Sequence, residues 1–142
     1  MEPLLAARGV RLALEGFDAP LPAAPADADQ IAQVARNLLD NALRHAAGEV
    51  RVAALRAPGR VGFAVTDDGP GIPREHIPRL TERFYRVDKA RDRARGNTGL
   101  GLAIVRHILL RHRGRLEIES EPGAGATFRV WLPAQGEAES PR

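Results

Sequence analysis

The order of periodic segments in this sequence predicts an α+β fold, a two-layer sandwich in which a mixed, mostly antiparallel sheet packs against helices. Residues 30–47 and 102–112 space their apolar side chains with the period of an amphipathic helix. Residues 49–67 and 115–132 alternate apolar and polar side chains around glycine-containing turns, as β-hairpins do. The order strand, helix, hairpin, charged segment, helix, hairpin favours helices on one side and a sheet on the other.

The bulk composition is that of one soluble globular domain. The chain has 142 residues, of which 44% are hydrophobic and 27% are charged. No apolar run approaches the roughly 20 residues that cross a bilayer, and the first residues lack the features of a signal peptide. We therefore expect a cytoplasmic domain over residues 1–134 and a disordered polar tail over residues 135–142.

Charge and metal-ligand content exclude several function classes. The chain has no cysteine, and its four histidines show no metal-ligand spacing, so a zinc site is not expected. The formal net charge is +3, but the arginines concentrate between Arg74 and Arg115 and are not interleaved with aromatic residues. This pattern favours a polyphosphate or an acidic protein partner over nucleic acid.

The N-terminal part begins with a strand pattern and leads into the first helix. Residues 8–17 alternate as a half-buried strand, and the prolines of residues 18–29 predict an extended connector. Asp27 or Asp29 can cap the helix over residues 30–47.

Two carboxamides lie on one flank of that helix. Asn37 and Asn41 are four residues apart, beside the apolar stripe. One interpretation is a pair of solvated polar residues. The other is a set of carbonyl oxygens directed at a hard cation, for which Mg²⁺ is suited.

The first hairpin runs directly into residues 67–73, with the sequence DDGPGIP. An aspartate at the end of a strand can accept a hydrogen bond from a ligand amine, while the glycines let the backbone pack against a flat ring. An ordinary loop with acidic turn residues is the alternative. A short helix is expected over residues 76–81.

A charged segment and a glycine-rich stretch precede the second helix. Residues 82–95 are rich in arginine, which favours a mobile lid over a merely solvated loop. Residues 96–102, with the sequence GNTGLGL, lead into the helix, where free N–H groups and the positive end of the helix dipole favour an anion such as phosphate. An ordinary turn is the alternative.

Four motifs now stand in one order: residues 37–42 (NLLDNA), 67–72 (DDGPGI), 82–86 (ERFYR) and 96–105 (GNTGLGLAIV). The ordered set resembles the catalytic, ATP-binding domain of two-component sensor histidine kinases. That domain is part of an ATPase superfamily with DNA gyrase B subunits, heat-shock chaperone ATPases and mismatch-repair ATPases. The resemblance covers residues 8–133 and implies a Bergerat-type fold with a mobile ATP lid.

The resemblance implies ATP and Mg²⁺ as cofactors and assigns the parts of the site. Asn41 would ligate Mg²⁺, Asn37 would contact phosphate or the metal shell, and Arg44 would meet the phosphates. The spacing Asp-x-Gly-x-Gly selects Asp67, rather than Asp68, as the acceptor for the adenine amine. The other residues assigned to the nucleotide are Gly69, Gly71 and Ile72 at the base, Thr98, Gly99, Leu100, Gly101 and Leu102 at the phosphates, Arg86 on the lid at the γ-phosphate, and Thr127, joined to Asp67 through a water. The expected catalytic residues are Asn37, Asn41, Arg44 and Arg86.

The expected reaction is phosphoryl transfer to another protein. ATPases of the superfamily resemble one another in a glutamate one turn before the metal-binding asparagine, and here that position is Asn37, which cannot act as a base. None of the four histidines lies in an acceptor motif. We therefore expect an excised domain that does not autophosphorylate and whose partners are the histidine-bearing dimerisation domain of its full-length kinase and a response regulator. We expect no membrane contact by this domain, although the full-length protein can be membrane-anchored.

Two alternatives remain at this point. An anti-sigma-type serine kinase of the same fold would phosphorylate a partner protein directly, and the phenylalanine motif of residues 82–86 argues against it. A degenerate interaction module would have lost ATP binding, which the intact Asn41, Asp67 and Gly101 argue against.

Overall fold

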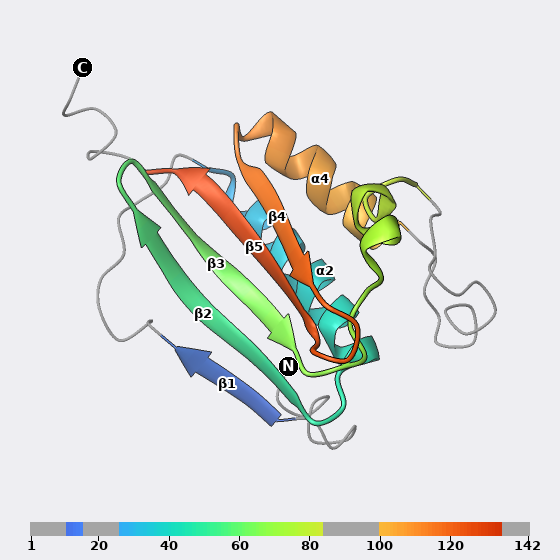
Figure 1. Cartoon of the computed structure of the whole chain (residues 1–142). Helices are drawn as coiled ribbons and strands as arrows, with labels where there is room; N and C mark the ends of the chain where they lie inside the picture. Colours follow the sequence, from blue (N-terminus) through green and yellow to red (C-terminus); the bar gives the residue numbers. More distant parts are fainter. Residues whose placement is uncertain (1–10, 16–25, 84–99, 135–142) are drawn as a thin grey trace.

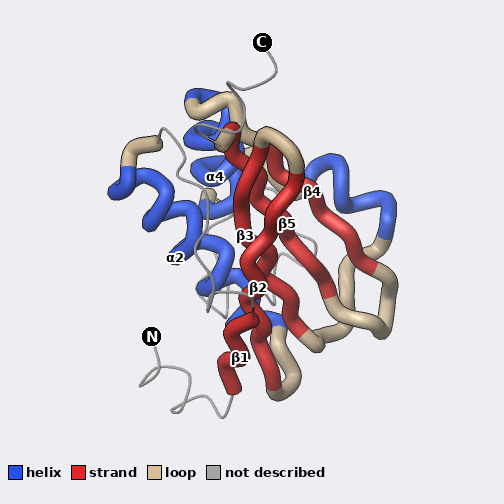
Figure 2. Tube along the Cα trace, turned by 90° about the vertical axis from the view of Figure 1, so that its left-hand side faces the viewer, coloured by secondary structure: helices blue, strands red, loops and turns tan. Residues whose placement is uncertain are grey.

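The computed structural model describes residues 11–15, 26–83 and 100–134. In this part of the chain a five-stranded sheet has the order β1-β2-β3-β5-β4. The helices α2 and α4 cover one face of the sheet, as both views show (Figures 1 and 2). The predicted α+β two-layer sandwich is confirmed, and helices and strands segregate because each has one apolar face to bury.

The sheet is mixed because its first strand runs differently from the others. β1 (Arg11–Glu15) pairs in parallel with β2 (Glu49–Ala57), whereas β2 with β3 (Arg60–Asp67), β3 with β5 (Ala126–Pro133) and β5 with β4 (Arg115–Ser120) are antiparallel pairs. Both predicted hairpins are confirmed. The flanks of β1 lie outside the described residues, as do most of the connector over residues 18–29 and the tail.

The helices begin and end close to their predicted bounds. α2 (Ala28–His45) is capped by Asp27, whose side chain accepts hydrogen bonds from the backbone N–H groups of Asp29 and Gln30. α4 (Gly101–Arg111) begins one residue earlier than predicted. The expected short helix after the first hairpin is the 3₁₀ helix η1 (Arg74–Arg79). Most of the expected lid, residues 84–99, lies outside the described residues.

The core lies between the two helices and the sheet. It is formed by alternate residues of the strands and by the apolar stripe of each helix, which bury large aliphatic and aromatic side chains together. Its members include Val34, Leu38, Val50, Val65, Val105, Leu109, Phe128 and Val130. This packing sets the end of β3 beside the C-terminal half of α2.

Candidate functional site

Asp67 is the last residue of β3 and is buried on the helix-covered face of the sheet. Only 4% of its surface is exposed. One carboxylate oxygen, Oδ1, accepts a hydrogen bond from the backbone N–H of Gly69 at 2.9 Å, and Oδ2 receives none from the residues that the structure describes. Burial raises the pKa of Asp67 above its ordinary value, and the Gly69 N–H and the charge of His45 partly offset that rise. A buried oxygen without a protein donor is available to a ligand donor.

The loop after Asp67 is framed by the turn between β4 and β5. Gly71 has a φ of +79°, and a Cβ built on it would lie 2.1 Å from the carbonyl oxygen of Glu121. Gly125 has a φ of +78°, and its Cβ would lie 2.1 Å from the carbonyl oxygen of Asp67. Both glycines are required because the two backbone segments touch where a side chain would stand.

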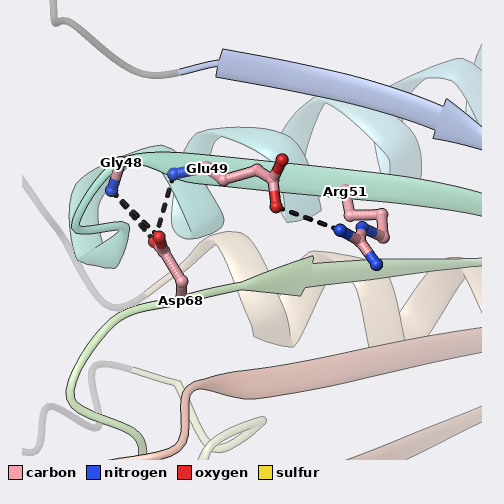
Figure 3. A network of polar contacts seen from close by, with 4 residues as sticks. All are labelled: Gly48, Glu49, Arg51 and Asp68. Carbon is pink, nitrogen blue, oxygen red and sulfur yellow. Dashed lines mark hydrogen bonds and ion pairs between the residues drawn. The ribbon is translucent and has the colours of Figure 1, made fainter.

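Asp68 points away from this loop and is bound to the turn between α2 and β2. Its Oδ1 accepts hydrogen bonds from three successive backbone N–H groups, those of residues 47–49, at 2.8, 3.0 and 3.2 Å. Figure 3 shows the bonds from Gly48 and Glu49. The Gly48 N–H is the largest of the causes that hold the pKa of Asp68 below its ordinary value. Asp68 therefore anchors the end of α2 to the end of β3, and its acceptor oxygens are already engaged.

Asn37 and Asn41 lie one turn apart on α2 and are both half-buried. The side-chain Nδ2 of Asn37 donates a hydrogen bond to the backbone oxygen of Gly101 at 3.3 Å. The side chain of Asn41 makes no hydrogen bond with any residue in the described ranges, although its backbone oxygen is bonded to His45 Nδ1. The structure thus brings Asn37 and the start of α4 together.

Arg44 forms an ion pair with Asp40, four residues earlier on α2. The Arg44 side chain retains 20% of its exposure, against 47% for the aspartate. Its guanidinium is therefore held at the surface of α2 with its charge partly compensated by a carboxylate.

The first turn of α4 carries backbone N–H groups at the positive end of the helix dipole. Leu100 occupies the N-cap position without a side-chain capping bond, and the first turn contains no acidic residue. A Cβ built on Gly101 would meet no atom of the described residues within 4 Å. Leu102, by contrast, packs against the core. Three other predicted residues, Arg86, Thr98 and Gly99, lie outside the described residues.

Thr127 was expected to join Asp67 through a water, but the structure does not bring the two side chains together. In the β3–β5 register Asp67 pairs with Ala126, whereas Thr127 pairs with Thr66. Because side chains alternate between the faces of a sheet, Thr127 lies on the face opposite Asp67. Its hydroxyl is bonded to the hydroxyl of Thr66 at 3.0 Å, so we leave Thr127 out of the candidate site.

The residues that hold the loop in place were not predicted from the sequence. Ser120 at the end of β4 and the turn that follows it contact the loop over residues 67–72, and Asp68 fixes its other side. A serine immediately before the glycine-rich turn of residues 121–125 is the signal in the sequence. That signal is weak, because serine is common before any turn.

The sandwich carries a buried aspartate at the end of β3, two asparagines on α2 and a helix start without a side-chain cap, and these groups are suited to a nucleotide. The family model described as "Histidine kinase-, DNA gyrase B-, and HSP90-like ATPase" matches residues 26–136. The chain belongs to this family, and the predicted resemblance is confirmed.

The relatives of this chain are sensor kinases. The phosphate regulon sensor protein PhoR of Pseudomonas aeruginosa is 50% identical over 107 residues, which cover 72% of this chain and 24% of that protein. The sensor-like histidine kinase SenX3 of Mycolicibacterium smegmatis is 43% identical over 106 residues, which cover 73% of this chain and 28% of that protein. The chain therefore spans about a quarter of the length of the curated relatives it matches.

Solved structures of histidine kinases share the fold. The structure of full-length ShkA in complex with AMPPNP superposes with a TM-score of 0.81 at 32% identity, covering 94% of this chain and 27% of ShkA. The catalytic domain of the histidine kinase ThkA gives a TM-score of 0.78 at 26% identity, covering 94% of this chain and 84% of that domain. In the described part of the chain, no helix has the length and apolar character to span a membrane.

Proposed function

We propose that this chain is the ATP-binding catalytic domain of a sensor histidine kinase, which donates the γ-phosphoryl group of ATP to a histidine on a separate dimerisation domain. Membership of the ATPase family and the names of the relatives support this proposal. So does the AMPPNP complex of ShkA, because AMPPNP is an analogue of ATP. The observation that carries it is the buried Asp67 carboxylate, one oxygen of which has no donor among the described residues.

Asp67 is suited to recognise the base. Its Oδ2 can accept a hydrogen bond from the exocyclic amine of adenine, and its Oδ1 is held by the Gly69 N–H. Gly69 and Gly71 leave backbone, without side chains, next to the base, and Ile72 closes the loop against the core. A guanine base presents a carbonyl oxygen at the position of that amine and would repel the carboxylate.

The asparagines of α2 are suited to Mg²⁺. The carboxamide of Asn41 offers a carbonyl oxygen of the kind that Mg²⁺ prefers, and it has no hydrogen bond with another described residue. Asn37 uses its NH₂ group on Gly101, which leaves its own oxygen available to the phosphate or the metal shell. Bound Mg²⁺ supplies charge neutralisation at the phosphate oxygens during transfer.

The rest of the site positions phosphate rather than activating water. The backbone N–H groups of the first turn of α4 form the positive end of the helix dipole, and Arg44 provides a further positive charge on α2. Asn37 cannot take a proton from water, and Asp40 is engaged by Arg44. These groups favour handing the phosphoryl group to an external nucleophile, with Arg86, Thr98 and Gly99 completing the phosphate contacts.

The partners follow from this role. We propose the dimerisation domain of the same full-length kinase as the acceptor and a response regulator as the onward partner, in the cytoplasm. We also propose that the folded domain extends to residue 134, just after the end of β5, and that residues 135–142 form a tail.

Calorimetric titration with ATP and Mg²⁺ tests the binding step, with GTP and with inorganic tripolyphosphate as comparisons. We expect ATP to bind more tightly than either comparison ligand. If the chain bound neither ATP nor tripolyphosphate, it would be a degenerate module.

Incubation with γ-labelled ATP tests the transfer step. We expect no label on the chain alone and acid-labile label on an added histidine-kinase dimerisation domain. Acid-stable label on a serine of an added partner would instead support the serine kinase alternative.

A further inference from the structure

Ser120 is a buried polar residue that none of the proposed ligand contacts uses. It ends β4 and is 8% exposed. Its hydroxyl donates a hydrogen bond to the backbone oxygen of Gly125 at 2.7 Å and accepts one from the backbone N–H of Ile72 at 2.8 Å. A serine hydroxyl has a single hydrogen, and an N–H can only donate, so these two partners fix its orientation.

The two partners of Ser120 belong to the two segments that form the base side of the site. Ile72 closes the loop that begins at Asp67, and Gly125 lies against the backbone oxygen of Asp67 at the start of β5. A further backbone bond joins the segments, from the N–H of Gly123 to the oxygen of Pro70 at 2.6 Å. The hydroxyl thus stands between the far end of the loop and the backbone beneath its first residue.

We propose that Ser120 is a positioning residue for base recognition. Its hydroxyl links Ile72 to Gly125 and thereby fixes the position of the loop of residues 67–72 relative to the β4–β5 turn. In that position the Oδ2 of Asp67 is directed at the adenine amine. This inference rests on the proposed function, because it concerns the same nucleotide site. It gives Ser120 a role in selecting adenine without any contact with the base.

Removal of the hydroxyl should change the base side, formed by the loop of residues 67–72 and the β4–β5 turn. It should leave intact the phosphate side, formed by α2 and the start of α4. Without the hydroxyl, the part-buried N–H of Ile72 and the buried C=O of Gly125 lose their partner, which is costly unless the loop moves or water enters. Either response displaces the loop of residues 67–72. The hydrogen bonds of Ser120 do not reach α2 or α4, where Asn41 and Gly101 lie.

The test separates the two sides of the site with two ligands. ATP uses both sides, whereas inorganic tripolyphosphate with Mg²⁺ uses only the phosphate side. Affinities of both ligands are measured by calorimetry for Ser120→Ala, at a temperature where circular dichroism shows a folded chain. We expect ATP affinity to fall about 5- to 20-fold and tripolyphosphate affinity to change less than about twofold.

Two further variants keep the test decisive. Thr66→Val is the matched control, because it also removes a strand hydroxyl, one that bonds Thr127 on the opposite face; we expect it to leave both affinities unchanged. If Ser120→Ala does not fold, Ser120→Cys has the same shape with a weaker donor and acceptor, and we expect a smaller loss confined to ATP.

An equal loss for both ligands, or no loss in a folded variant, would overturn the positioning role. The proposed function fails differently, since it fails when the unaltered chain binds ATP no more tightly than tripolyphosphate.

Discussion

The base side and the phosphate side of the proposed site are built in opposite ways. On the base side, the loop of residues 67–72 touches the β4–β5 turn backbone to backbone, and hydrogen bonds from both flanks hold it. On the phosphate side, a side-chain bond of 3.3 Å runs from Asn37 on α2 to Gly101 on α4. A Cβ on Gly101 would meet no described atom within 4 Å.

This difference indicates which side is held by protein contacts and which side is completed by the ligand. The base side is preorganised, because protein hydrogen bonds hold its loop and the Oδ1 of Asp67, while Oδ2 receives none from the described residues. The phosphate side leaves donors and a carboxamide for the ligand to satisfy. We therefore expect substitutions in the backbone frame of the base side to disturb the fold together with binding, and phosphate-side substitutions to disturb binding alone.

Alanine substitutions at two glycines give the largest contrast. Gly71→Ala forces a positive φ on a residue with Cβ and places that Cβ 2.1 Å from a backbone oxygen, so we expect a loss of about 3 kcal/mol or more of unfolding free energy. Gly101→Ala finds open space at a helical position, so we expect stability to be unchanged or up to about 1 kcal/mol higher.

Urea unfolding measures the stabilities and calorimetry the ATP affinities. We expect Gly101→Ala to lower ATP affinity about 5- to 10-fold, because the added methyl group occupies the space left for phosphate. A destabilised Gly101→Ala, or a fully stable Gly71→Ala, would contradict the contrast between the two sides.

Asp67→Asn is the next largest change, and it acts on binding. The variant removes the charge and can present an NH₂ group to the adenine amine, so we expect ATP affinity to fall about 100-fold. Titration with ATP and with tripolyphosphate checks this, and the tripolyphosphate affinity serves as the internal control. A loss of ATP affinity below about threefold would remove Asp67 from base recognition.

The sequence predicted the elements well because each depends on local patterns. The amphipathic stripe of α2 and the alternation in the hairpins each lie within one short segment. The spacing of the DDGPGI motif selected Asp67, and the structure shows the physical difference between the two aspartates. Asp67 is buried with an available oxygen, whereas Asp68 is bound by three backbone N–H groups.

The frame around the base side could not be predicted in the same way. Ser120 and Ile72 are 48 positions apart, and no local pattern relates a hydroxyl to a backbone N–H at that distance. Thr127 is a different case, because its assignment from a motif overlooked strand parity. Phe128 faces the core, so alternation alone places its neighbour Thr127 on the other face.

Asn41→Ala tests the phosphate side with a smaller effect. Loss of one neutral oxygen ligand should lower ATP affinity about tenfold in the presence of Mg²⁺ and leave it nearly unchanged in EDTA. Fold stability should change little, because the Asn41 side chain makes no hydrogen bond with the described residues. The difference in ATP affinity with and without Mg²⁺ is the measurement. An equal loss in both conditions would show that Asn41 contacts the nucleotide and does not hold the metal.

The pH dependence of stability gives the smallest effect and concerns the base side alone. Burial raises the pKa of Asp67 in the folded state, so the folded chain binds this proton more tightly than the unfolded chain, whose pKa is near 3.8. The ionised carboxylate is therefore a cost to folding above the raised pKa, and that cost shrinks as pH falls from the raised pKa towards 3.8.

The melting temperatures of Asp67→Asn and of the unaltered chain, measured without nucleotide, check this sign. We expect the variant to be more stable by a few degrees at pH 7, since a neutral carboxamide avoids the cost of burying the charge, and the gap to narrow near pH 4. The lowered pKa of Asp68 has the opposite effect on the pH dependence of stability. Because Asp68 is present in both proteins, its effect cancels when their melting temperatures are compared. If the difference in melting temperature did not change with pH, burial would not destabilise the ionised Asp67 carboxylate. The availability of its Oδ2 would then reflect only the geometry of the loop.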